Sequence, residues 1–164
     1  MLGIAYVLDS YLIWSTVLLV LYLTYRINKD KILDFLLSIG LALVLSEGLK
    51  YLFNQPRPDA TFEGSSFPST HSSVAFAVFF FYLLCVRNPR YLYKVLKIGE
   101  DKLSDRRFAF SMSVFVVLLS AVLVALLRVY ISAHYLTDVI AGIFVGFIAI
   151  IPFLFYDVSS RRVK

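Results

Sequence analysis

Charged residues and cysteine are both scarce in this chain of 164 residues. Only 16% of the residues are charged, against about 25% in a typical soluble domain, whereas 60% are hydrophobic. A soluble protein of this length cannot bury so much apolar surface, and a disordered chain would be poor in apolar residues. The single cysteine, Cys85, excludes an intrachain disulfide framework and a cysteine-rich metal site.

Long apolar runs are abundant, and five of them predict membrane-spanning helices. They cover residues 2–25, 32–53, 72–86 (beginning as early as Ser69), 108–127 and 139–156. The second run has 22 residues, or about 33 Å of helix, which spans a hydrocarbon core of about 30 Å. Because hydrocarbon requires each segment to satisfy its own backbone hydrogen bonds, we expect an all-α polytopic membrane bundle. One integral membrane domain is expected to cover residues 1–164.

The net charge of +5 would suggest a nucleic-acid partner in a soluble protein, but here it is explained by topology. Thirteen of the 16 basic residues lie in the segments 26–31, 87–107 and 157–164. By the positive-inside rule these segments are cytoplasmic, so the N-terminus is expected outside and the C-terminus inside. Segment 87–107 is basic and partly amphipathic, which predicts a cytoplasmic loop whose helix touches anionic headgroups.

The three remaining basic residues, Lys50, Arg57 and Arg128, are expected on the outward side. The only two histidines, His71 and His134, fall on that side as well. Three cations in one small site would repel each other unless an anion joins them, and a phosphate fits that requirement. Ser69 or Thr70 is expected to cap a helix whose first backbone amides favour an anion.

His134 and Asp138 are four residues apart, which places them on one face of a helix. A carboxylate at one ring nitrogen fixes the histidine tautomer and makes the other nitrogen a better nucleophile. His71 is then available to give a proton to a leaving oxygen. Each residue alone is ordinary, and Glu47, one turn before Lys50, is expected to be a partner for a cation. Together they predict phosphomonoester hydrolysis without a metal.

These residues resemble the three-part signature of the type 2 phosphatidic acid phosphatase superfamily. The family pattern is Lys-x6-Arg-Pro, Pro-Ser-Gly-His and Ser-Arg-x5-His-x3-Asp. The chain reads Lys50-x6-Arg57-Pro58, then Pro68-Ser69-Thr70-His71, then Leu127-Arg128-x5-His134-x3-Asp138. It departs from the pattern at Thr70, where the family has glycine, and at Leu127, where the family has serine.

The resemblance implies a role for each matching residue. His134 attacks phosphorus and forms a phosphohistidine, Asp138 orients His134, and His71 protonates the leaving group and then activates water. The phosphoryl oxygens are held by Lys50, Arg57, Ser69, Thr70 and Arg128. No metal and no cofactor are implied. The fold is also similar to that of vanadate haloperoxidases, but those are largely soluble proteins, which favours a phosphatase.

The expected function is hydrolysis of a lipid phosphate or diphosphate in the plasma (inner) membrane, with the site facing the periplasm or the cell exterior. Candidate substrates by family analogy are lipid A 1-phosphate, undecaprenyl diphosphate and phosphatidylglycerol phosphate. Transfer of the phosphoryl group to another lipid is an alternative. A non-enzymatic alternative is an anion-binding transporter or channel subunit, which would not need two histidines. From the placement of the motifs, a lipid entrance is expected between the third and fifth predicted helices.

Overall fold

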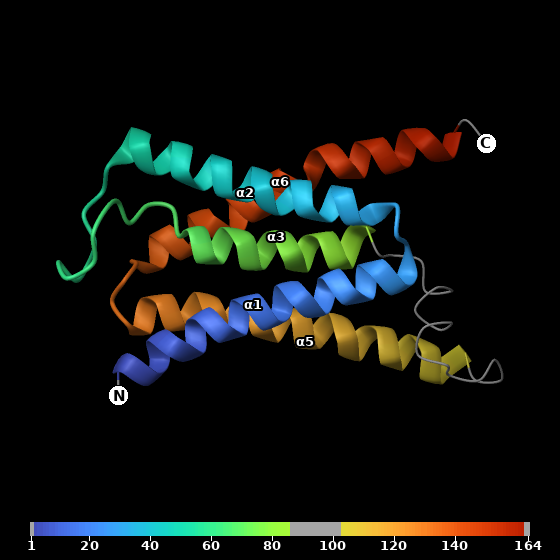
Figure 1. Cartoon of the computed structure of the whole chain (residues 1–164), viewed down its shortest axis with the longest axis horizontal. Helices are drawn as coiled ribbons and strands as arrows, with labels where there is room; N and C mark the ends of the chain where they lie inside the picture. The colour runs from blue at the N-terminus through green and yellow to red at the C-terminus, as the bar shows by residue number, and fades with distance from the viewer. Residues whose placement is uncertain (1, 86–102, 163–164) are drawn as a thin grey trace.

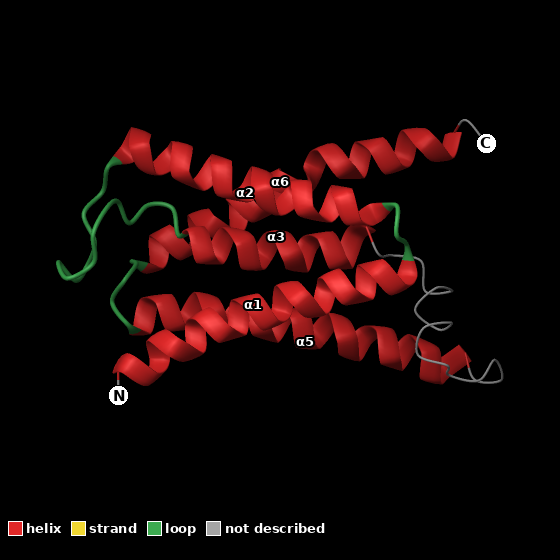
Figure 2. Cartoon of the chain, viewed as in Figure 1, coloured by secondary structure: helices red, strands yellow, loops and turns green. Residues whose placement is uncertain are grey.

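The structure, a computed structural model, describes residues 2–85 and 103–162. It contains the five expected helices, and the described residues contain no strand (Figure 2). The helices are α1 (Leu2–Ile27), α2 (Lys31–Phe53), α3 (Thr70–Cys85), α5 (Leu103–Tyr130) and α6 (Leu136–Arg162). The all-α prediction is thus confirmed. Most of the predicted interfacial segment 87–107 lies outside the described residues.

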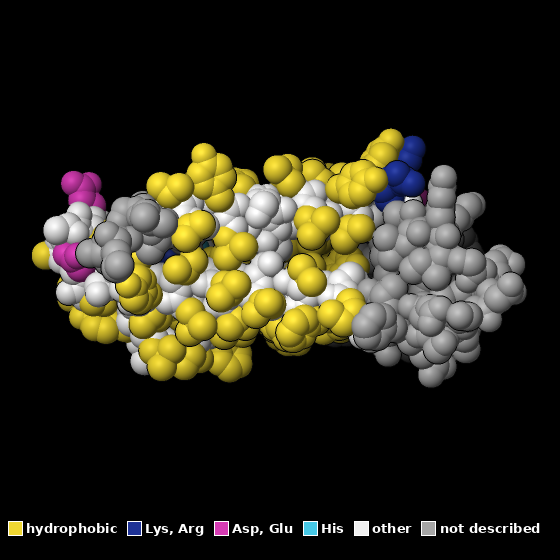
Figure 3. Space-filling view, turned by 90° about the horizontal axis from the view of Figure 1, so that it is seen from below, with side chains coloured by type: hydrophobic (Ala, Val, Ile, Leu, Met, Phe, Trp, Pro, Cys, Tyr) yellow, Lys and Arg dark blue, Asp and Glu magenta, His cyan; other side chains and the backbone are white. Residues whose placement is uncertain are grey.

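Three helices are long and apolar enough to cross a membrane within the part of the chain that is described. These segments are Lys31–Phe53, Ser111–Tyr130 and Leu136–Leu154, while the apolar part of α3, Thr70–Leu84, is shorter. Large apolar side chains such as Trp14, Leu36 and Phe144 are exposed on the outside of the bundle. Hydrophobic side chains also cover the middle of the face shown in Figure 3. Such a surface is suited to the hydrocarbon of a membrane, since a soluble protein rarely exposes large apolar patches.

Helix α3 lies at the centre of the bundle and contacts α1, α2, α5 and α6 (Figure 1). Every residue from Ser72 to Phe79 is buried. A helix that is apolar and buried all round is typical of the middle of a bundle. At one end of the bundle lie the start of α1, the loop from α2 to α3 and the turn from α5 to α6. The two-ended arrangement matches the expected topology, while the N-out orientation stays a prediction.

Helices α3 and α6 touch backbone to backbone. A Cβ atom added at Gly142 would lie 2.7 Å from the carbonyl oxygen of Ser69, and one added at Gly146 would lie 2.6 Å from that of Ser73. These glycines form a G-x-x-x-G pair, the spacing that lets membrane helices approach closely. The contact fixes the start of α3 against the first half of α6.

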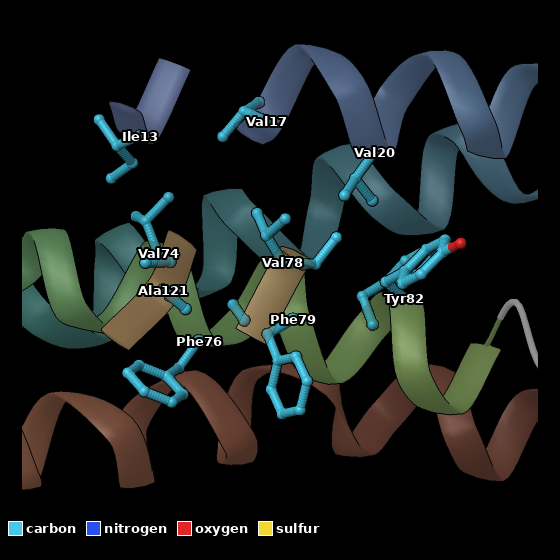
Figure 4. Packing of buried hydrophobic residues seen from close by; sticks show 14 of the residues in the cluster. Ile13, Val17, Val20, Val74, Phe76, Val78, Phe79, Tyr82 and Ala121 are labelled. Atoms are coloured by element: carbon cyan, nitrogen blue, oxygen red, sulfur yellow. The ribbon is translucent and has the colours of Figure 1, made fainter. Parts of the chain in front are cut away.

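The rest of the core consists of apolar side chains from all five helices (Figure 4). Ile13, Val17 and Val20 of α1 pack toward α3, whose Phe81 makes an edge-on contact with Phe35 of α2 at 5.3 Å. The buried Tyr82 hydroxyl donates a hydrogen bond to Ser113 Oγ on α5 at 2.8 Å. Helix α1 thus covers the side of α3 that α6 leaves open.

Candidate active site

The predicted site residues meet at the end of the bundle that carries the α2–α3 loop. They are Lys50 near the end of α2, Arg57 in the loop, Ser69, Thr70 and His71 at the start of α3, Arg128 near the end of α5, and His134 and Asp138 around the start of α6. Each of the three cations acts electrostatically on both histidines. The spacing in the sequence and the expected helix topology were therefore sufficient to predict that these side chains lie at one end of the bundle.

The His134 ring is buried, and its orientation comes from a backbone carbonyl. Its Nδ1 lies 2.7 Å from the carbonyl oxygen of Ser66. Because a carbonyl only accepts hydrogen bonds, Nδ1 must carry the proton, and the lone pair of the neutral ring is then on Nε2. Asp138 Oδ2 is 3.7 Å from Nδ1, too far for a hydrogen bond. The sequence-based assignment of Asp138 as the direct orienting group is thus not what this geometry gives.

Asp138 is completely buried and joins two helices at their starts. Its Oδ2 accepts a hydrogen bond from the backbone N–H of Tyr135 at 2.8 Å, as the third residue of a capping box does. Its backbone carbonyl accepts the N–H of Ser69 at 3.0 Å. The other carboxylate oxygen, Oδ1, has no hydrogen-bond partner among the described residues. Asp138 therefore caps α6, ties it to α3 and supplies a negative charge beside His134.

Burial lowers the pKa of His134 from 6.5 to about 3, and the positive charges of Arg128 and Arg57 contribute to the decrease. The hydrogen bond to Ser66 opposes this effect but is outweighed. His134 is consequently neutral across the physiological pH range. A neutral imidazole with a lone pair on Nε2 is the form that a nucleophile requires.

Arg128 shapes the turn that holds His134. Its backbone carbonyl accepts the N–H groups of both Ala133 and His134, at 3.1 and 3.2 Å. Ser132, which lies just before Ala133, has a φ of 56°, the left-handed conformation that commonly ends a helix. The Arg128 side chain is 6% exposed, so its charge lies inside the protein next to both histidines.

The α2–α3 loop is fixed by its own hydrogen bonds and by bonds to the α5–α6 turn. Ser66 donates its N–H to the carbonyl of Gln55 and its hydroxyl to the carbonyl of Pro56. Arg57 donates to the carbonyls of Gly64 and Ala133, at 3.2 and 3.3 Å. The backbone N–H of Asp59 bonds to the carbonyl of Ser132. These contacts place the Ser66 carbonyl that orients His134.

Ser69, one of the two residues expected from the sequence to do so, caps the N-terminus of α3. Its Oγ accepts the N–H of Ser72 at 3.4 Å, and Ser73 makes the first backbone bond of the helix to the Ser69 carbonyl. The amides of Thr70 and His71 therefore belong to the first turn, where N–H groups lack partners within the helix and favour an anion. The Ser69 hydroxyl is buried beside that of Ser72. Its contact with phosphate stays a prediction.

Glu47 is the expected partner of Lys50, and it has a second partner that was not expected. Its Oε1 accepts hydrogen bonds from Lys50 Nζ at 2.8 Å and from Thr70 Oγ1 at 2.9 Å. Thr70 is the residue that stands where the resembled family has glycine. The hydroxyl that distinguishes this chain is thus bound to a carboxylate of α2.

Two cavities adjoin these residues. An open polar cavity of about 480 Å³ is lined by Glu47, Lys50, Tyr51, Asn54, Arg57, Glu63, Gly64 and Ser65. An apolar cavity of about 130 Å³ is lined by Ile13, Trp14, Val17, Ile39, Leu43, Thr70, His71 and Val74. Since α3 and α6 touch along their backbones, the expected lipid entrance between them is wrong. The apolar cavity lies instead among α1, α2 and α3.

Three features of the site were missed by sequence reasoning. The Ser66 carbonyl leaves no trace in the sequence because every residue has one. The Gly142-x3-Gly146 spacing was readable, but its partner helix was not. The bond between Glu47 and Thr70 joins residues 23 positions apart and becomes visible only once α2 and α3 are placed.

The chain is similar to a known protein family and to solved structures. The sequence model of the PAP2 superfamily matches residues 31–162. A PAP2 type phosphatidylglycerolphosphate phosphatase from Bacillus subtilis is 26% identical, with a TM-score of 0.67, covering 99% of this chain and 77% of that one. LpxE from Aquifex aeolicus is also 26% identical, with a TM-score of 0.54 and coverage of 88% and 82%. No curated protein matches the chain.

Proposed function

The chain belongs to the PAP2 superfamily, and from this membership we propose that it is an integral membrane phosphatase that hydrolyses a lipid phosphate through a phosphohistidine. The observation that carries the proposal is the buried, neutral His134, whose Nδ1 faces the Ser66 carbonyl and whose Nε2 is left as the nucleophile. Solved relatives with similar structures include a phosphatidylglycerolphosphate phosphatase, which supports a lipid phosphate as the substrate class.

In the first step, the lone pair of His134 Nε2 attacks phosphorus and the bond from phosphorus to the ester oxygen breaks. The leaving oxygen takes a proton from His71, which acts as the general acid. Lys50, Arg57, Arg128 and the first amides of α3 stabilise the negative charge on the phosphoryl oxygens. His134 keeps its Nδ1 proton, so the phosphohistidine ring is cationic, and the Asp138 carboxylate beside it stabilises that charge.

In the second step, the neutral His71 takes a proton from water, and the water oxygen attacks phosphorus. The bond between phosphorus and Nε2 breaks, its electron pair returns to His134, and inorganic phosphate leaves. His71 thus exchanges the role of acid for that of base, and both histidines end in their starting states. Another hydroxyl compound at the same place would give phosphoryl transfer in place of hydrolysis.

The substrate is proposed to be presented at headgroup depth on the extracytoplasmic face of the plasma membrane, in keeping with the positive-inside rule. Phosphatidylglycerol phosphate, undecaprenyl diphosphate and lipid A 1-phosphate are the candidates. The fixed cations and the two histidines lie where the helices end, so a lipid can keep its chain in the bilayer while its phosphate reaches them.

The test is release of inorganic phosphate from a panel of these lipids by the purified protein in detergent. His134→Ala should lower kcat more than about 1,000-fold, since it removes the nucleophile. Its melting temperature should stay well above the assay temperature, and its elution from a sizing column should match that of the wild type. Activity should survive EDTA, and orthovanadate should inhibit because it resembles the five-coordinate transition state.

An anion-binding transporter or channel subunit is the competing function. It would bind a lipid phosphate without releasing inorganic phosphate, and His134→Ala would leave that binding in place. Normal phosphate release by His134→Ala would refute the nucleophile. No release from any lipid of the panel would refute the enzymatic function.

A further inference from the structure

The loop from α2 to α3 makes an apolar contact of its own, apart from the main core. The ring of Phe62 packs against Ile131 and Ala133, which are 4% and 0% exposed, and Leu127 packs against the same pair. These three partners belong to the end of α5 and the turn that follows it. Leu127 stands where the family pattern has serine, so this chain has an apolar side chain where the pattern has a hydroxyl. The cluster is therefore a feature for which the family pattern does not account.

The ring of Phe62 also contacts the side chain of Arg57. The Cζ atom of the guanidinium lies 5.8 Å from the centroid of the ring, within the range of about 6 Å for a cation–π contact. Arg57 also donates hydrogen bonds to the carbonyls of Gly64 and Ala133, at 3.2 and 3.3 Å. These two bonds are long, since such bonds usually measure about 2.7–3.2 Å. The aromatic contact therefore adds to hydrogen bonds that are individually weak.

A short turn presents Phe62 to these partners. The backbone N–H of Phe62 donates to the carbonyl of Asp59 at 3.2 Å, and that of Thr61 donates to Asp59 Oδ1 at 2.9 Å. The N–H of Asp59 donates in turn to the carbonyl of Ser132 at 3.1 Å. The loop is thus joined to the α5–α6 turn by a backbone bond at Asp59 and by the ring of Phe62, and Arg57 lies just before both.

The turn that receives Phe62 also carries the proposed nucleophile. Ala133, whose carbonyl accepts a bond from Arg57, directly precedes His134. The charge of Arg57 acts on both His134 and His71. A ring that fixes Arg57 against this turn therefore also fixes the guanidinium relative to the imidazole that is proposed to attack phosphorus.

We propose that Phe62 is a positioning residue, which packs on the cluster of Leu127 and Ile131 and thereby holds the Arg57 guanidinium in place for a phosphoryl oxygen. The inference rests on the proposed function, because Arg57 is one of the cations proposed to stabilise the phosphoryl group. An arginine side chain loses much rotamer freedom when it is fixed, so a contact that fixes it beforehand strengthens its interaction with an anion. Phe62 and Leu127 thus act on the phosphate through Arg57.

Orthovanadate measures this effect without turnover, because it is an anion that resembles the transition state of phosphoryl transfer. In calorimetric titrations in detergent, Phe62→Ala should bind orthovanadate about 10-fold more weakly than the wild type, whereas Phe62→Tyr, which keeps the ring, should stay within about threefold. Phe53→Ala is the matched control, because Phe53 packs on Phe67 of the same loop with ring centroids 5.0 Å apart. It should stay within about twofold. Equal affinities for Phe62→Ala and Phe53→Ala would overturn the positioning role.

Leu127→Ala tests the other side of the apolar contact. It should weaken orthovanadate binding about fivefold, and it should add no further loss to Phe62→Ala, because both variants remove the same contact. Losses that multiply in the double variant would contradict the proposal, since the two residues would then act separately.

A second cycle tests whether Phe62 acts through Arg57. Arg57→Lys keeps the charge but removes the planar guanidinium. Phe62→Ala should lower kcat/KM for the most active lipid phosphate of the panel about 10-fold in the wild-type background and less than about twofold in the Arg57→Lys background. A 10-fold loss in both backgrounds would overturn the proposal, because Phe62 would then support the fold in general.

The two proposals fail in different ways. If the wild type binds orthovanadate but releases no phosphate from any lipid, the phosphatase function is wrong, and the affinity of Phe62→Ala still decides whether the ring positions Arg57. If the wild type is active and Phe62→Ala behaves like Phe53→Ala, the function stands and the positioning role is wrong.

Discussion

The site has two walls that hold their side chains to very different degrees. The α5–α6 wall comprises Arg128, His134 and Asp138, which are 6%, 3% and 0% exposed. The α2 wall comprises Glu47 and Lys50, whose side chains are 62% and 16% exposed. On the first wall, the Ser66 carbonyl contacts the His134 ring, and the backbone N–H of Tyr135 binds the Asp138 carboxylate. On the second, one exposed carboxylate holds the lysine through an ion pair.

The difference fits the separate demands of reaction and capture. A nucleophile gains most from being fixed in advance, because no conformational entropy then has to be lost to orient it at each turnover. A lysine that meets an incoming phosphate must exchange its partner, which is easy when that partner is an exposed carboxylate worth about 1 kcal/mol or less. We therefore expect substitutions on the α5–α6 wall to lower kcat, and substitutions on the α2 wall to change KM.

Among substitutions that leave both histidines in place, the largest effect is expected at Asp138. Asp138→Asn keeps an oxygen to cap Tyr135 but removes the charge beside His134, so kcat should fall about 10- to 100-fold, or about 1.4–2.7 kcal/mol. Asp138→Ala also loses the cap and should cost about 0.5–2 kcal/mol of stability. Phosphate release and melting temperature measure the two effects. A loss for Asp138→Asn as large as that for His134→Ala would mean that Asp138, and not the Ser66 carbonyl, sets the tautomer.

The next effect concerns the support of the α5–α6 wall by α3. Gly146→Ala places a Cβ 2.6 Å from the Ser73 carbonyl, so the helices must shift, and we expect a loss of about 1–3 kcal/mol in stability. Gly48→Ala on α2 is the matched control, because its Cβ meets nothing within 4 Å. It should be neutral or stabilising by up to about 1 kcal/mol. Equal melting temperatures for the two variants in detergent would show that the backbone contact does not support the site.

Acid should weaken the α5–α6 wall through His134. Below pH 6.5 the unfolded chain binds a proton at this histidine, whereas the folded protein does not until about pH 3. Stability therefore falls as the pH is lowered through this window, by up to about 1.4 kcal/mol per pH unit. Melting temperatures between pH 6.5 and 4.5 measure the slope, and His134→Asn should make it shallower. An unchanged slope in that variant would place the acid sensitivity elsewhere.

The smallest effect is expected on the α2 wall. Glu47→Gln leaves a bond to Thr70 but removes the charge that pairs with Lys50, so KM should fall a few-fold while kcat and the melting temperature stay within error. Added salt should shrink the difference because the Glu47 carboxylate of the pair is exposed. A large fall in kcat would place Glu47 among the groups that position the reaction.

The sequence predicted the side chains of the candidate site but not the backbone groups that position them. Lys50, His71 and His134 could be found because their chemistry and spacing are written in the sequence, and five apolar runs placed them at one end of a bundle. The Ser66 carbonyl could not be found, since its role depends on how the loop folds back. The entrance was misplaced because the closeness of α3 and α6 depends on which residues face the two glycines.

The glycine pair also sets the register of the two helices. Gly142 and Gly146 stand against Ser69 and Ser73, so the same four-residue step repeats on both sides of the contact. Sliding α6 by one residue would drive Ile143 and Phe147 into a gap that does not admit a methyl group. His71 follows Ser69 by two residues, and Asp138 precedes Gly142 by four. The distance between His71 and His134, the proposed acid and nucleophile, therefore depends on a contact between two backbones, which substitutions of side chains elsewhere do not touch.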